Sequence, residues 1–65
     1  MRLAVIGTGL IGASVGLAAK RGGATVVGFD ADRPTAEVAA ERGAVHEVAG
    51  TLGEALREAE LAVVA

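Results

Sequence analysis

Six consecutive residues near the N-terminus can bind an anion without any charged side chain. The run Gly7-Thr8-Gly9-Leu10-Ile11-Gly12 follows an apolar stretch, Leu3 to Ile6, and opens a helical stretch. Gly7 permits a sharp turn, Gly9 leaves room for a ligand against the backbone, and Gly12 allows close helix packing. The first amides of a helix lack intrahelical partners and carry about half a positive charge. This G-x-G-x-x-G pattern therefore predicts a diphosphate-binding turn at residues 7–12.

The two residues after the second glycine are expected to bind through their backbone. We expect Leu10 and Ile11 to offer their N–H groups to the diphosphate while their side chains pack inward. Gly16 lies one turn after Gly12 and should extend the close approach of the helix. Ser14 has two equal interpretations, a contact to a phosphate or a hydrogen bond back to a helix carbonyl.

The acid that closes the next apolar run suits the sugar of the same ligand. Asp30 lies 18 residues after Gly12 and directly follows Thr25 to Phe29. At about this spacing a carboxylate accepts hydrogen bonds from the ribose hydroxyls of a dinucleotide. Like charges about 4 Å apart repel by about 4 kcal/mol at an effective dielectric constant of 20, so Asp30 opposes a 2′-phosphate. We therefore expect NAD in preference to NADP. Arg33 is the residue that could accept the extra phosphate, but we favour its interpretation as a solvated residue at a helix start.

Strands and helices must alternate to place these groups. Strands are expected over Leu3–Ile6, Thr25–Phe29, Val45–Val48 and from about Leu61, and helices over Leu10–Arg21, from Asp32 to about Arg42, and after Thr51. Such alternation indicates an α/β fold with a parallel sheet. Right-handed crossovers give the strand order 3-2-1-4. The prediction is the first βαβαβαβ part of a Rossmann-type doubly wound sheet.

Local signals mark the ends of the expected helices. Gly22 or Gly23 ends the first helix and Gly43 the second. Asp32 caps the second helix, with Pro34 in its first turn, and Thr51 and Glu54 form a capping box for the third. The buried face of the first helix is expected to comprise Ile11, Val15, Ala18 and Ala19.

No residue has the setting of a catalytic or metal-binding group. The chain has no cysteine and a single histidine, His46, on the weak third strand far from the glycine turn. Asp32 suits a helix cap better than an acid catalyst. The remaining acids look like solvated or capping residues: Glu41, Glu47, Glu54, Glu58 and Glu60. We therefore expect catalytic residues and metal ligands to be absent from this chain.

The composition excludes several classes of binding partner for this chain. The net charge is −2 with scattered signs and there is one aromatic residue, which argues against a nucleic-acid surface. No apolar run approaches the roughly 20 residues that span a bilayer, so no membrane contact and a cytoplasmic location are expected. Sixty-five residues suffice for one small domain at most. We interpret residues 1–65 as the N-terminal part of a dinucleotide-binding domain whose remainder, with the substrate and dimerisation domain, lies outside this chain.

Three segments together resemble one enzyme family. Gly-Thr-Gly-Leu-Ile-Gly-Ala-Ser at 7–14, Val-Val-Gly-Phe-Asp at 26–30 and Ala-Glu-Leu-Ala-Val-Val-Ala at 59–65 resemble the prephenate/arogenate dehydrogenases. The G-L-I-G-x-S stretch is the most specific part, and Ala13 departs mildly from the glycine that is frequent in the family. Residues matching the family's cofactor positions are Gly7, Gly9, Gly12 and Asp30. The resemblance implies NAD(P)-dependent oxidative decarboxylation of prephenate or arogenate in tyrosine biosynthesis.

The same resemblance places other functions outside this chain. The family's catalytic histidine, its substrate-binding arginine and its helical dimerisation domain lie beyond residue 65, so a small-molecule substrate and a homodimer belong to the full-length protein. Two alternatives remain open. One is another dehydrogenase or reductase of the six-phosphogluconate type, acting on a small hydroxy or imino acid. The other is a module that senses a nucleotide without catalysis.

Overall fold

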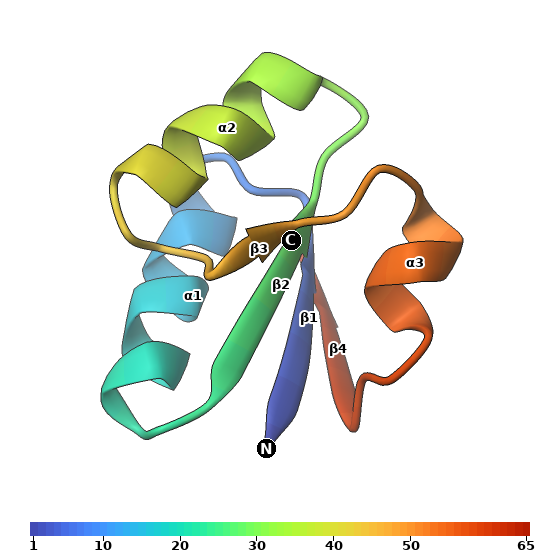
Figure 1. Ribbon diagram of the computed structural model, residues 1–65. Helices are drawn as coiled ribbons and strands as arrows, with labels where there is room; N and C mark the ends of the chain where they lie inside the picture. The colour runs from blue at the N-terminus through green and yellow to red at the C-terminus, as the bar shows by residue number, and fades with distance from the viewer.

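A four-stranded parallel sheet forms the centre of the structure, a computed structural model that describes residues 1–65 (Figure 1). The strands are β1 (Arg2–Ile6), β2 (Thr25–Phe29), β3 (Glu47–Val48) and β4 (Leu61–Val64), and the helices are α1 (Leu10–Arg21), α2 (Arg33–Glu41) and α3 (Leu52–Leu56). The strands lie in the order β3-β2-β1-β4, and every neighbouring pair is parallel. The predicted α/β fold class and strand order are confirmed.

The helices cover both faces of this sheet. Figure 1 shows α1 and α2 together on one side and α3 on the other, as right-handed crossovers require. Because both faces are covered, the central strands are apolar throughout: Leu3, Ala4 and Val5 of β1 are buried, as are Val26 and Val27 of β2. No helix in the structure is long and apolar enough to cross a membrane.

The packing face of α1 differs from the predicted one. Ile11 and Ala18 are exposed, whereas Gly12 and Gly16 are buried and Ala13, Val15 and Ala19 pack against the core. A Cβ on Gly12 would overlap the carbonyl oxygen of Gly7, and one on Gly16 would overlap that of Ala44. The helix therefore lies on the sheet through its smallest residues, and the prediction that Ile11 and Ala18 belong to the buried face is wrong.

The third strand is shorter than predicted because a histidine side chain takes the place of one backbone acceptor in its pairing with β2. β3 pairs with β2 only through Val27–Glu47 and Gly28–Val48. One step earlier, the amide of Val26 donates to Nδ1 of His46 at 2.9 Å instead of to a backbone carbonyl. The expected strand over 45–48 is thus confirmed only in its second half.

Helix ends largely follow the predicted signals. Gly23 and Gly43, which follow α1 and α2, have positive φ angles of 91° and 76°. Asp32 is the N-cap of α2, although its carboxylate accepts the Thr35 hydroxyl and no backbone amide. Thr51 accepts the amide of Glu54 at 3.1 Å, as a capping box requires, while the Glu54 carboxylate accepts the amide of Gly50 at 3.0 Å, one residue before the expected partner.

Candidate functional site

A cavity of about 430 Å³ lies where β1, β2 and β4 end. Its lining residues are Gly7, Gly9, Leu10, Ile11, Gly12, Asp30 and Ala65. The first six of these are the site residues predicted from the sequence, so the fold brings all of them to one place. Ligands of open parallel sheets bind outside the carboxyl ends of the strands, which is where this cavity lies.

Gly7 makes the turn from β1 into α1. Its φ is +91°, a left-handed conformation that side chains resist, and its amide donates to the carbonyl of Phe29 at 2.8 Å. A Cβ at this position would also lie 2.7 Å from the carbonyl oxygen of Ala65. Glycine is thus required here both by the backbone angle and by the neighbouring end of β4.

Gly9 and Gly12 serve different purposes. Gly9 is the N-cap of α1, and a Cβ built on it meets nothing within 4 Å. Its missing side chain therefore leaves free space at the mouth of the cavity, where a ligand can approach the backbone. At Gly12 a Cβ would overlap the Gly7 backbone, so this glycine lets the helix start close to the turn.

The start of α1 presents unpaired backbone donors. The first helical hydrogen bond runs from Ala13 to Gly9 at 2.8 Å, and no protein group accepts from the amides of Leu10, Ile11 or Gly12. No side chain caps this end and no acidic residue lies in its first turn. These three amides form a positive site suited to an anion.

The side chains of Leu10 and Ile11 lie opposite to the prediction. They are 87% and 72% exposed, so the expectation that they pack inward is wrong. Successive helical residues are about 100° apart. Once Gly12 and Gly16 face the sheet, Leu10 and Ile11 must point away from it. The helix begins with two apolar side chains at the rim of the cavity.

Asp30 lines the same cavity and is bound to both flanking turns. Its Oδ2 accepts the amide of Thr8 at 2.8 Å and the Thr8 hydroxyl at 3.3 Å, and its Oδ1 accepts the amide of Asp32 at 2.9 Å. The Thr8 amide bond, followed by that of Asp32, lowers the pKa of Asp30 below its ordinary value. The carboxylate is therefore ionised at neutral pH and able to accept further hydrogen bonds.

The neighbouring polar residues are occupied by structural contacts. Arg33 forms an ion pair with Glu37 at 3.7 Å, and both side chains are more than half exposed. Ser14 donates to the carbonyl of Leu10 at 3.0 Å, which is the helix-carbonyl alternative. His46 lies on the β3 side of the sheet, where its Nδ1 accepts the Val26 amide. No group of three or more metal-ligating side chains is present in the structure.

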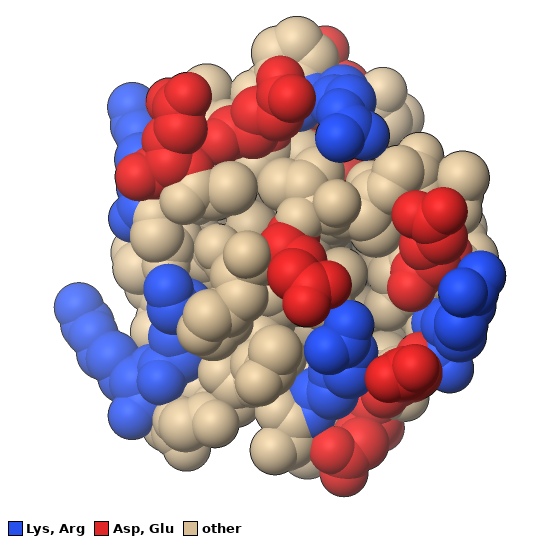
Figure 2. All heavy atoms as spheres, viewed as in Figure 1, with Lys and Arg blue, Asp and Glu red and all other residues tan.

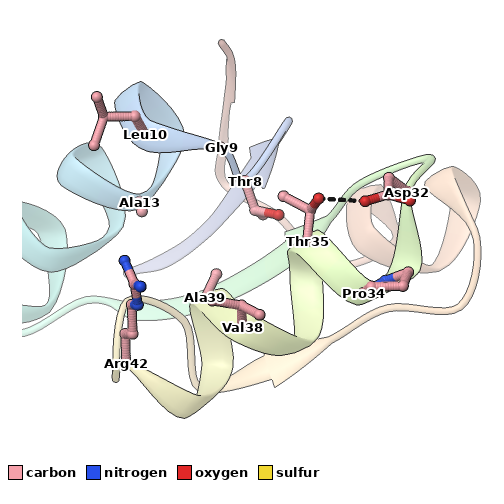
Figure 3. Close-up of a pocket in the computed structure, with 10 residues that line it drawn as sticks. All are labelled: Thr8, Gly9, Leu10, Ala13, Asp32, Pro34, Thr35, Val38, Ala39 and Arg42. Atoms are coloured by element: carbon pink, nitrogen blue, oxygen red, sulfur yellow. Dashed lines mark hydrogen bonds between the residues drawn. The ribbon is translucent and has the colours of Figure 1, made fainter.

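Sequence reasoning missed Thr8. It is 3% exposed and donates two hydrogen bonds to Asp30, although the glycine pattern treats its position as variable. A second cavity, of about 390 Å³, also touches Thr8 and lies between the start of α1 and the length of α2 (Figure 3). Apart from Thr8, this second cavity is lined by Gly9, Leu10, Ala13, Asp32, Pro34, Thr35, Val38, Ala39 and Arg42.

The cavity at the start of α1 has no basic side chain in its lining. On the face of the molecule that Figure 2 shows, acidic and basic side chains both occur. The positive potential of the anion site therefore comes from backbone amides rather than from lysines and arginines in the cavity.

Comparison with known proteins finds a similar solved structure over nearly the whole chain. No family model matches the chain, and no curated protein matches it. Among solved structures it is similar to the arogenate dehydrogenase of Synechocystis, with a TM-score of 0.89 and 34% sequence identity. The match covers 98% of this chain and 23% of the arogenate dehydrogenase chain. The resemblance to the N-terminal part of the prephenate/arogenate dehydrogenase family is therefore confirmed over nearly the full length of this chain.

Proposed function

We propose that residues 1–65 form the N-terminal part of the dinucleotide-binding domain of an NAD(P)-dependent dehydrogenase. The observation that carries this proposal is the row of three unpaired amides at Leu10, Ile11 and Gly12, beside the open space at Gly9. A diphosphate fits such a site because its oxygens accept those hydrogen bonds and its charge complements the helix end. Asp30, which lines the same cavity, supplies an ionised acceptor for a ribose hydroxyl.

We further propose NAD as the preferred cofactor. A 2′-phosphate beside Asp30 would meet a carboxylate that stays ionised at neutral pH. No lysine or arginine lines the cavity that Asp30 lines, and Arg33 forms an exposed ion pair with Glu37. Both observations favour a ribose that carries a free 2′-hydroxyl.

The full-length protein is proposed to oxidise prephenate or arogenate with loss of carbon dioxide. Held by the amides of Leu10, Ile11 and Gly12 and by Asp30, NAD would supply the acceptor for a hydride from the ring carbon bearing the hydroxyl. A base would take the hydroxyl proton, and carbon dioxide would leave as the ring becomes aromatic. Residues 1–65 contribute cofactor binding alone to that chemistry, and the base and the substrate-binding groups belong to the rest of the protein. A homodimer is the proposed form of the full-length protein, as the resemblance to the prephenate/arogenate dehydrogenases implies.

A turnover assay of the full-length protein tests the activity. Prephenate and arogenate are each supplied with NAD or NADP, and reduced nicotinamide is followed by its absorbance. Reduction with either substrate supports the proposal. Reduction only with another small hydroxy or imino acid would replace the substrate, and NAD binding without any turnover would favour a nucleotide-sensing module.

The cofactor preference is tested by Asp30→Ser in the same protein. Loss of the carboxylate removes the repulsion, so the ratio of kcat/KM for NAD to that for NADP should fall about tenfold or more. Glu41→Gln is the matched control because it removes one negative charge from the exposed surface of α2 outside the cavity. An unchanged ratio in Asp30→Ser, or an equal fall in Glu41→Gln, would refute the role of Asp30.

A further inference from the structure

We propose that Thr8 and Asp30 form a clamp that holds the glycine turn in its binding shape before any nucleotide is present, with Thr8 as a positioning residue. The inference rests on the proposed function, in which the turn binds the diphosphate and Asp30 binds the ribose. It gives Asp30 a second role in the site. It also gives a role to the residue between the first two glycines, whose type the sequence pattern leaves open.

The hydrogen bonds of Asp30 join two turns that are distant in sequence. Its Oδ2 accepts both donors of Thr8, the amide at 2.8 Å and the hydroxyl at 3.3 Å, in the turn between β1 and α1. Its Oδ1 accepts the amide of Asp32 at 2.9 Å, in the turn between β2 and α2. The carboxylate therefore fixes the distance between the turn that carries the free amides and the turn that leads into α2.

Thr8 is held from its other side by packing. The residue is 3% exposed, and its methyl group lies over Gly28, where a Cβ would be 3.0 Å from Thr8 Cγ2. The threonine fits here because position 28 has no side chain. With the methyl against β2 and the hydroxyl on Asp30, the side chain cannot rotate without losing one of these contacts. Thr8 thus connects the carboxylate to the packed interior.

The Asp30 carboxylate is consequently oriented before the ligand binds. A carboxylate has about four lone-pair sites, and three are used by Thr8 and Asp32. The remaining capacity lies on Oδ1, so one ribose hydroxyl can be accepted without rearranging the turn. Ordering the residue before binding spares the entropy that a mobile side chain would lose when the ligand arrives.

Amide hydrogen exchange in the nucleotide-free, full-length protein tests the clamp directly. Thr8→Val keeps the volume of the side chain and removes the hydroxyl. We expect about three- to tenfold faster exchange of the hydrogen-bonded amides at the turn, those of Gly7, Thr8 and Ala13, as loss of one hydrogen bond to a carboxylate implies. Thr8→Ser retains the hydroxyl and should restore slow exchange. The control is Thr35→Val, which removes a threonine hydroxyl from the neighbouring Asp32 without touching the turn.

The opposite pattern would overturn the proposal. If Thr8→Val exchanges like the wild type while Thr8→Ser exchanges faster, Thr8 acts through its methyl packing alone. If Thr35→Val speeds exchange of the Gly7, Thr8 and Ala13 amides as much as Thr8→Val does, the effect is a general one and no clamp exists.

Binding of inorganic diphosphate to the same protein gives a second readout. Asp30→Asn removes a negative charge near the anion site, which by electrostatics alone should strengthen diphosphate binding. The clamp predicts weaker binding, because an amide group cannot accept from both Thr8 and Asp32 and the turn loosens. Competition of diphosphate against NAD should show an inhibition constant about three- to tenfold higher. A lower or unchanged constant would contradict the clamp.

These readouts separate the clamp from the proposed function. Exchange is measured without nucleotide, so slow exchange that depends on the Thr8 hydroxyl would support the clamp even in a protein that binds no NAD. Conversely, normal NAD binding with exchange that ignores the hydroxyl would uphold the cofactor site and refute the clamp.

Discussion

At the scale of single residues, the turn contains glycines that are needed for different reasons. The spacing predicted which positions are glycine-dependent, but only the packed structure separates the free space at Gly9 from the crowded position of Gly12. The orientation of Leu10 and Ile11 could not be predicted from hydrophobicity. It follows from the backbone contact of Gly12, which turns these apolar side chains outward.

Alanine substitutions at the two glycines should therefore separate stability from binding. Gly9→Ala places a methyl group in open space, at a φ of −67° that alanine tolerates, so the free energy of unfolding should change by less than about 1 kcal/mol. The methyl group would occupy the space proposed for the diphosphate, so NAD affinity should fall at least tenfold. Gly12→Ala forces a Cβ onto the Gly7 backbone and should cost about 3 kcal/mol or more.

Urea unfolding and NAD titration of both variants in the full-length protein check this difference. A large loss of stability in Gly9→Ala, or full NAD affinity in the same variant, would show that the space at Gly9 has been misassigned.

Asp30 should make stability depend on pH only under acidic conditions. Hydrogen bonds to its ionised form lower its pKa in the folded state, chiefly that from the Thr8 amide. The stabilisation is then fully present above the unfolded pKa, about 3.9, and is lost as the pH falls through the lower folded pKa. The stability difference between wild type and Asp30→Asn should be constant above about pH 5 and shrink below about pH 4. Unfolding free energies of both proteins, measured across this pH range, test the prediction. A stability difference that grows on acidification would contradict it.

At the scale of elements, residues that begin and end helices allowed most of the fold to be predicted. Leu10–Arg21 was predicted with both ends correct, because the glycines before and after the helix leave little choice. The early residues of the expected third strand failed because His46 replaces a ladder carbonyl with its side chain, which no propensity describes. Lys20 shows a similar limit, because no local signal indicates a partner 23 residues away. Its Nζ donates to the carbonyl of Gly43 at 2.6 Å, beyond the end of α2.

Lys20→Met should loosen this connection between the two helices. Methionine keeps much of the aliphatic stem and loses the donor, so the free energy of unfolding should fall by about 1 kcal/mol. Arg21→Met is the matched control, because Arg21 is exposed at the next position and forms no hydrogen bond or ion pair. Its effect should remain within about 0.5 kcal/mol. Equal losses in the two variants, measured by urea unfolding, would argue against a specific role for Lys20.

At the scale of the whole molecule, a small core supports one half of the proposed dinucleotide site. Only 14 of the 65 residues are buried, and the buried apolar side chains are valine and alanine apart from Leu3, so packing contributes little per residue. β4 also exposes Leu61 and Val64 at the edge of the sheet. Dinucleotides bind across two mononucleotide-binding halves of a doubly wound sheet, and the order β3-β2-β1-β4 supplies the first of them.

The isolated 65-residue chain should consequently bind NAD weakly or not at all. Half of the contacts to the ligand would be absent, and part of the binding energy would be spent on ordering a marginally stable domain. Isothermal calorimetry of this chain beside the full-length protein measures the difference. Micromolar affinity in the short chain would show that the glycine turn and Asp30 suffice by themselves.

Gly28 has a consequence for how the protein can change during evolution. A Cβ on Gly28 would lie 2.8 Å from Val45 Cγ1 and 3.0 Å from Thr8 Cγ2, so residues from two distant segments share the space above it. A larger side chain at any of these three positions must be offset by a smaller one at another. Positions 8, 28 and 45 should therefore covary among homologous sequences, although they are separated along the chain and only one of them belongs to the glycine pattern.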